Sequence, residues 1–145
     1  MRKIILLILF LLLTGDVNAE TKIYCDCVYG ERQAIDVSTG AVLSTDESLI
    51  NKKNDVFFYI DEQNKKIYDS GKKILKTTSF NENEIKVFHV VNLDSSLSNA
   101  EIWNINRNNG YVEGFIVFEY MNKGKLERNT TAIYGMCEKA KENKF

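Results

Sequence analysis

Three cysteines carry the most recognisable chemistry of this chain. Cys25 and Cys27 lie two residues apart near its beginning, and Cys137 lies near its end. Cysteines form disulfides, ligate metals as thiolates or act as nucleophiles. We expect a disulfide between Cys137 and the Cys25/Cys27 segment, because such a bond would hold the two ends of the domain together.

Spacing alone does not decide which early cysteine pairs with Cys137. Residues i and i+2 of a strand point to the same face, so Cys25 and Cys27 are both available. Cys25 lies deeper in the first apolar strand, and we therefore expect the disulfide Cys25–Cys137. Cys27 is then a free thiol that packs as a small hydrophobic side chain. The alternatives are an intermolecular disulfide and a metal site of three cysteines with His89.

The rest of the sequence offers little catalytic chemistry. His89 is the only histidine, and it lies in an apolar stretch where a packed or edge position is typical. The sequence has no Gly-x-Ser-x-Gly, His-Glu-x-x-His or glycine-rich phosphate motif. We expect no enzymatic activity, no catalytic residue, no metal and no cofactor. An enzyme acting through Cys27 or His89 is the alternative.

Aromatic side chains indicate where a partner would bind. Alternation along a strand puts Phe57 and Tyr59 on the face opposite Phe58, so both faces carry aromatic surface. Tyr111 and Phe115 form a second outward pair if the apolar residues between them face the core. We expect Phe57, Tyr59, Tyr111 and Phe115 to contact a partner protein or a small apolar ligand.

The elements that position these residues have a hydrophobic period of two rather than 3.6. Glycine, asparagine, aspartate and serine punctuate the sequence, and Asn108-Asn109-Gly110 is typical of a tight turn with φ > 0. This pattern predicts an all-β domain, a small antiparallel meander barrel or sandwich of about eight strands whose first and last strands are neighbours. The main expected strands are 23–29, 55–61, 66–69, 74–80, 85–93, 101–106, 111–120 and 126–137, with a loop at 94–99.

The beginning of the chain has the layout of a secretory signal peptide. Arg2 and Lys3 precede the apolar run Ile4–Leu13, and Val17-Asn18-Ala19 supplies small residues for cleavage. A helix of this run is about 15 Å long, too short for a bilayer core of about 30 Å. We predict a cleaved signal peptide at 1–19 and a periplasmic or secreted protein, in a compartment where disulfides persist.

The remaining chain, 20–145, is predicted to be a single β-domain with a solvated tail at 137–145. The formal net charge is −1 at pH 7. Nucleic-acid affinity depends on many basic contacts to phosphate, so we expect no nucleic-acid partner. The sequence has no block of like charges that indicates a membrane-surface patch, and we expect no stable membrane insertion.

Two stretches resemble small uncharacterised exported bacterial proteins. Residues 103–110 read W-N-I-N-R-N-N-G, and residues 135–139 end the domain as G-M-C-E-K. The early Y-C-D at 24–26 and the late cysteine also resemble the two ends of the periplasmic C-type lysozyme inhibitors. That resemblance implies a small disulfide-closed β-barrel that plugs the lysozyme cleft. Only Ser70-Gly71 corresponds to the family's inhibitory loop, so the resemblance assigns no inhibitory residue.

These patterns together favour an exported, non-enzymatic binding protein of the bacterial periplasm or envelope. Its ligand is a partner protein or a small apolar molecule. One alternative is a protein that acts like a lysozyme inhibitor. Another is a structural envelope protein that forms disulfide-linked homodimers through the spare cysteine, Cys27.

Overall fold

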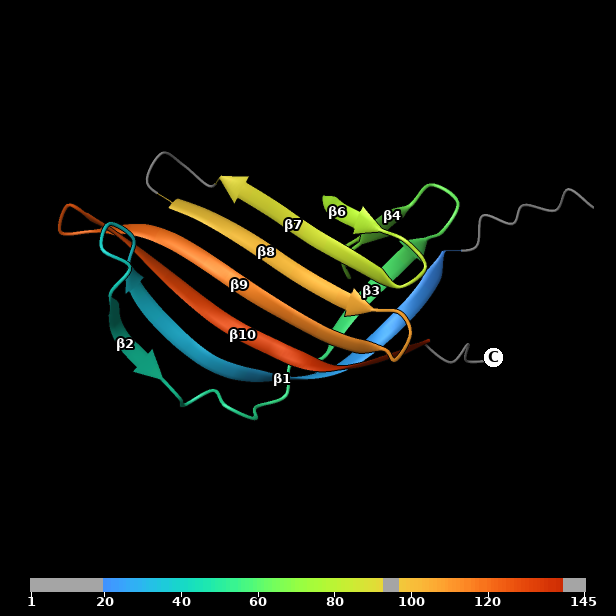
Figure 1. The fold of residues 1–145 in the computed structure, drawn as a ribbon, viewed down its shortest axis with the longest axis horizontal. Coiled ribbons are helices and arrows are strands. Elements are labelled where there is room, and N and C mark those ends of the chain that lie inside the picture. The colour runs from blue at the N-terminus through green and yellow to red at the C-terminus, as the bar shows by residue number, and fades with distance from the viewer. Residues whose placement is uncertain (1–19, 93–96, 140–145) are drawn as a thin grey trace, which may run out of the picture.

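The computed structural model describes residues 20–92 and 97–139, so the predicted signal peptide at 1–19 lies outside the described residues. The described residues form one ten-stranded antiparallel sheet (Figure 1), which confirms the predicted all-β class. The strands are β1 (Thr21–Asp36), β2 (Val42–Asp46), β3 (Val56–Asp61), β4 (Lys66–Tyr68), β5 (Ile74–Leu75), β6 (Thr77–Phe80), β7 (Glu84–Asn92), β8 (Leu97–Asn106), β9 (Tyr111–Asn122) and β10 (Lys125–Lys139).

At one end the sheet curls into a nearly closed barrel. The strand order is β5-β4-β3-β1-β10-β9-β8-β7-β6, so the first strand pairs with the last, as predicted. A single residue, Lys76, separates β5 from β6. Leu75 pairs with Ile67 of β4, whereas Thr77 pairs with Val87 of β7. This bent strand joins the two edges of the sheet, and counting it as one strand gives a ring of eight.

At the other end the sheet stays open. β1, β9 and β10 have 16, 12 and 15 residues, whereas β3 and β4 have only 6 and 3. The long strands therefore extend past the barrel as a curved sheet (Figure 1). There β2 pairs only with the C-terminal half of β1, from Arg32 opposite Asp46 to Ile35 opposite Val42. We call this part of the molecule the open end.

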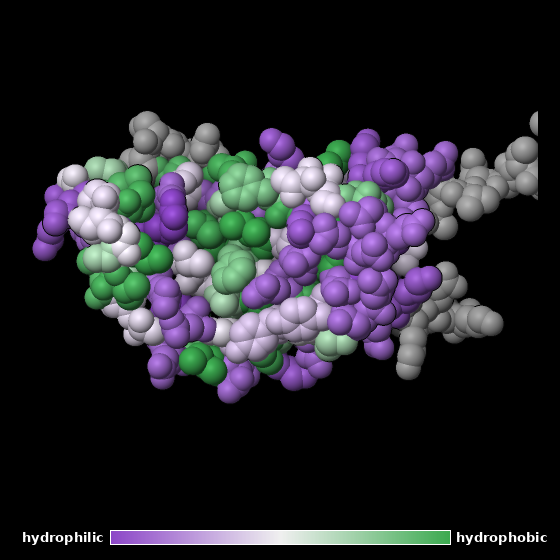
Figure 2. All heavy atoms as spheres, viewed as in Figure 1, coloured by the Kyte–Doolittle hydropathy of each residue, from purple (hydrophilic) through white to green (hydrophobic). Residues whose placement is uncertain are grey.

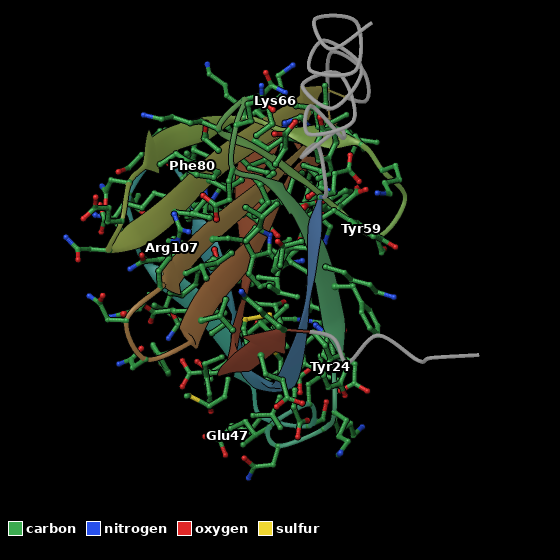
Figure 3. All side chains as sticks on the ribbon, turned by 90° about the vertical axis from the view of Figure 1, so that its right-hand side faces the viewer. Tyr24, Glu47, Tyr59, Lys66, Phe80 and Arg107 are labelled. Carbon is green, nitrogen blue, oxygen red and sulfur yellow. A yellow bond between two sulfur atoms is a disulfide. The ribbon has the colours of Figure 1, made fainter. Side chains whose placement is uncertain are left out.

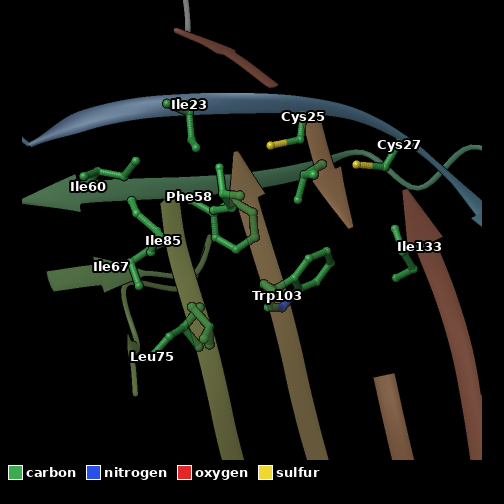
Figure 4. Close-up of a cluster of buried hydrophobic side chains, with 13 residues drawn as sticks. Ile23, Cys25, Cys27, Phe58, Ile60, Ile67, Leu75, Ile85, Trp103 and Ile133 are labelled. Carbon is green, nitrogen blue, oxygen red and sulfur yellow. The ribbon is translucent and has the colours of Figure 1, made fainter. Parts of the chain in front are cut away.

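The hydrophobic core fills the closed end of the barrel (Figure 4). Alternate residues of each strand point inward, which explains the period of two in the sequence. The Phe58 and Trp103 rings meet edge to face, with centroids 5.3 Å apart. The indole of Trp103 also lies over Gly114, where an added Cβ would be 2.2 Å from a ring carbon. The buried core residues are Ile23, Cys25, Cys27, Phe58, Ile60, Ile67, Leu75, Ile85, Val87, Trp103, Ile105, Val112 and Ile133.

The predicted disulfide joins Cys25 to Cys137. The two residues are direct cross-strand partners in the β1–β10 ladder, so the bond links the first strand to the last. The ladder continues to Lys139 opposite Ile23, so residues 137–139 belong to the strand and not to the predicted tail. Residues 140–145 of that tail lie outside the described residues.

The predicted loop at 94–99 is wrong in its second half. β8 begins at Leu97, which pairs with Tyr120, and Asn99 pairs with Phe118. Serine and asparagine at 98 and 99 are typical of turns, but pairing with the long strand β9 keeps this stretch extended. The predicted turn at Gly110 is confirmed, with φ of 78°.

Removing the disulfide should destabilise the fold strongly. The bond closes a loop with a sequence separation of 112, for which chain entropy gives about 4–5 kcal/mol as an upper figure. We expect the double variant Cys25→Ala/Cys137→Ala to lose several kcal/mol in urea unfolding, followed by circular dichroism. Cys27→Ala keeps the disulfide and is the matched control. Equal losses in the two variants would contradict a stabilising role for the bond.

Candidate functional site

The outward face of the open end carries two apolar rows. The register of β7, β8, β9 and β10 sets the members of each row side by side across the four strands. We call the two rows together the apolar band. The first row is Phe88, Ile102, Phe115 and Ala132, and the second is Val90, Ala100, Val117 and Thr130.

Polar rows border the apolar band on both sides. On one side Arg128 donates from Nε and Nη2 to Glu119 Oε1, at 2.7 and 2.5 Å, and Ser98 Oγ donates to Glu119 Oε2 at 3.2 Å. On the other side stand Lys86, Asn104 and Glu113. Because Arg128 and Glu119 neutralise each other, the first border adds little net charge to the apolar band.

The band is hollowed into a shallow groove. A groove of about 370 Å³ covers both rows and reaches Ser98, Glu119 and Arg128. A second groove of about 460 Å³ shares Phe115 and Thr130 with it and extends to β1. Figure 2 shows apolar side chains gathered over this part of the sheet, with hydrophilic side chains crowding the right of the view. The two grooves therefore adjoin each other at Phe115 and Thr130 on the outer face.

The structure divides the four predicted surface aromatics between two places. Phe115 lies in the apolar band, and Tyr111 faces outward on the same strand, two cross-strand rows away. Phe57 and Tyr59 lie on β3, whose neighbours are β1 and β4, so they are separated from the band. The Phe57 ring packs against Tyr24, with centroids 5.0 Å apart.

Lysines cover the β3 aromatics. The Nζ of Lys22 is 4.7 Å from the centroid of Phe57, and that of Lys72 is 3.4 Å from the centroid of Tyr59. These cation–π contacts already occupy ring faces that a ligand would use. Figure 3 shows Tyr24 and Tyr59 on one side of the closed end, and Phe80 and Arg107 on the other.

Sequence reasoning misses most of the apolar band. Phe88 and Val90 are 45% and 44% exposed, although they belong to the most apolar strand of the first half of the chain. The segment Val87–Val91 carries a signal that could have located the band, because its strand has apolar residues on both faces. One of its faces enters the core with Val87, and the other forms the band with Phe88 and Val90.

The free cysteine is enclosed in the core. Cys27 is 0% exposed and makes no disulfide, as predicted for a packed thiol. Burial, followed by the negative charges of Asp26 and Asp55, raises the pKa of the Cys27 thiol to about 11. The thiolate is the reactive and metal-binding form of cysteine. As folded, Cys27 is therefore a poor nucleophile and a poor route to an intermolecular bond.

His89 lies on the inward face of β7, opposite Glu101 of β8. Its Nδ1 accepts a hydrogen bond from the backbone N–H of Lys76 at 3.4 Å, and its Nε2 is buried without a partner. In the described part of the chain, no three His, Cys, Asp or Glu side chains are grouped to hold a metal ion. Nor does any helix within residues 20–92 and 97–139 have the length and apolarity to cross a membrane.

Comparison with models of known protein families finds no match, and a search of curated proteins finds no similar sequence.

The buried thiol should resist alkylation. We expect Cys27 of the native protein to react with iodoacetamide at pH 8 far more slowly than in urea, because burial disfavours the thiolate. Burial raises the pKa of the Cys27 thiol from 9.0 to about 11, so ionisation favours the unfolded chain, and the free energy of unfolding should fall as the pH rises from 9 to 11. Intact-mass spectrometry follows the alkylation. Equal alkylation rates in the native and the unfolded protein would contradict the burial of the Cys27 thiol.

Proposed function

We propose that this chain is an exported, non-enzymatic binding protein of the bacterial periplasm or envelope, and that its apolar band holds a partner protein. The observation that carries the proposal is an apolar band bordered on both sides by polar rows. Exposed apolar patches with polar rims are typical of protein-binding surfaces. The sequence features of residues 1–19 and the Cys25–Cys137 disulfide support the compartment.

The shape of the band favours a protein over a small ligand. Small-molecule sites usually enclose most of the ligand surface. Here the two grooves are spread along one outer face, and Phe88 and Val90 at its margin are almost half exposed. A wide, shallow apolar face matches a partner that presents a similar face of its own. The non-enzymatic part of the proposal is supported by the enclosed, weakly acidic thiol of Cys27.

Site-specific photo-cross-linking tests this proposal in the native bacterium. We expect a photoreactive phenylalanine analogue at Val117 to capture one partner, and the same analogue at Ser44 on β2 to capture none. The purified partner should then bind the wild-type protein in calorimetry. A charge in the centre of the band should disrupt a contact of hot-spot size, so Val117→Lys should weaken binding about 30-fold.

Val42→Lys is the matched control for this test. Val42 is 54% exposed on β2, outside the band, so a lysine there should leave partner affinity unchanged. Circular dichroism checks that both variants are folded. Equal capture at residues 44 and 117, or an unchanged affinity of folded Val117→Lys, would reject the band as the binding surface.

A second candidate function is lysozyme inhibition. It is favoured by the disulfide between the first and last strands of the barrel, the architecture that the resemblance to lysozyme inhibitors implies. Ser70 and Gly71 lie in the exposed turn between β4 and β5. If this function holds, an equimolar amount of the purified protein should block lysis of bacterial cell walls by a C-type lysozyme. Undiminished lysis at excess protein would remove this candidate.

A further inference from the structure

The inward side of the sheet changes in character between the closed end and the open end. At the closed end it carries the apolar core, whose last cross-strand row contains Trp103. The next row toward the open end consists of His89, Glu101, Ile116, Thr131 and Arg32. The row after it consists of Val91, Asn99, Phe118, Asn129 and Ala34. We call these two rows, which mix polar and apolar side chains, the inner rows.

The inner rows can be reached from solvent. Trp103, in the adjacent core row, is 5% exposed, whereas His89, Asn99 and Glu101 are half-buried. On one flank β6 pairs only with the first half of β7, and on the other flank β3 pairs only with the beginning of β1. Within residues 20–92 and 97–139, no strand therefore closes the ring around the inner rows.

Three polar atoms at the inner rows are buried without a hydrogen-bond partner, namely His89 Nε2, Asn99 Oδ1 and Trp103 Nε1. The Nδ1 of His89 accepts a hydrogen bond from the backbone N–H of Lys76, so the proton of the neutral imidazole is on Nε2. In Figure 4 the blue nitrogen of Trp103 lies on the edge of the indole away from Cys25. Two donors and one acceptor are thus unpaired, and because unpaired buried polar groups are costly, they indicate a place that a polar ligand completes.

The charges around these atoms favour a ligand without net charge. Glu101 lies directly opposite His89, and at the far end of the same row Arg32 donates from Nε to Thr131 Oγ1 at 3.2 Å. The carboxylate of Glu101 disfavours an anion, and the guanidinium of Arg32 disfavours a cation. A hydroxyl group both donates and accepts hydrogen bonds. A neutral ligand with several hydroxyl groups therefore matches this mixture of donors and acceptors.

Aromatic rings lie beside these polar groups on the same face. Phe118 belongs to the second inner row, and Tyr120 follows it on the inward side of β9. Their ring centroids are 6.1 Å apart, with 31° between the ring planes, and both side chains are half-buried. The hydroxyl of Tyr120 donates to Glu127 Oε2 at 2.9 Å, which holds its ring in place. Aromatic surface with a few convergent polar groups is typical of small-molecule sites, and the apolar C–H face of a sugar ring packs on such a surface.

We propose that the inner rows bind a neutral saccharide. One sugar ring packs against Phe118, and its hydroxyl groups donate to Glu101 and to Asn99 Oδ1 and accept from His89 Nε2. Rotation of the half-buried Asn99 and His89 side chains presents these atoms to the sugar. The apolar band lies on the opposite side of the same strands, so this site is separate from the surface proposed for the partner protein.

Tryptophan fluorescence tests the proposal directly. Trp103 is the only tryptophan of the chain, and it adjoins the first inner row. We expect a titration of the purified, disulfide-bonded protein with maltose, cellobiose and N,N′-diacetylchitobiose to give a saturable change in emission with at least one of them, at a Kd of about 1 mM or below. Glycerol, which has hydroxyl groups but no sugar ring, should give none. The absence of a saturable response to all three disaccharides would overturn the proposal.

Substitutions in the inner rows separate binding from stability. Asn99→Leu removes an unpaired buried acceptor, so the free energy of unfolding in urea should stay the same or rise, whereas saccharide affinity should fall about tenfold. Glu101→Gln keeps the shape of the side chain and should also weaken binding. Thr45→Leu, exposed on the outer side of β2, is the control and should bind like the wild type.

Circular dichroism checks that the variants are folded. Wild-type affinity in folded Asn99→Leu and Glu101→Gln would also overturn the proposal. Capture of a partner at Val117 on the outer face is independent of these variants, so failure of the saccharide site and failure of the apolar band are distinguishable.

Discussion

The pairing of the first strand with the last is the constraint on which the rest of the structure depends. β1 pairs with β10 from Ile23 opposite Lys139 to Asp36 opposite Glu127, and the Cys25–Cys137 disulfide lies within this ladder. The ladder fixes which residues of both strands face the core. Through β9, β8 and β7 it also fixes the register of the rows on the outer face. The same strand register therefore determines both the core on the inner face and the apolar band on the outer face.

The sequence predicts the fold class because alternation is a local property. Ile23, Cys25 and Cys27 alternate with polar or outward residues, and their inward face is the one found in the core. The start of β8 was not predicted, because serine and asparagine at 98 and 99 favour turns locally. Only their long-range pairing with β9 keeps these residues extended. The apolar band could not be predicted for the same reason. Its rows combine residues of four strands, and the register between these strands cannot be inferred from any one of them.

The surface aromatics illustrate the limit of reasoning from one strand. Phe57 and Phe115 give the same signal in the sequence, an outward aromatic on a strand with an apolar opposite face. In the structure the neighbours of Phe57 are Tyr24 and Lys22, which cover its ring, whereas those of Phe115 are apolar residues that extend its surface. What separates the two is the identity of the cross-strand neighbours, and this depends on topology.

The pairing of β1 with β10 also sets the order in which the molecule can form. A chain emerging from a ribosome presents β1 first, but the principal partner of β1 is the last of these strands to appear. Contacts of such long sequence separation are slow to form. Until the final strand is released, the barrel has no seam and Cys137 cannot reach Cys25. The barrel therefore cannot close before its last strand is available, whatever structure the earlier strands have already formed.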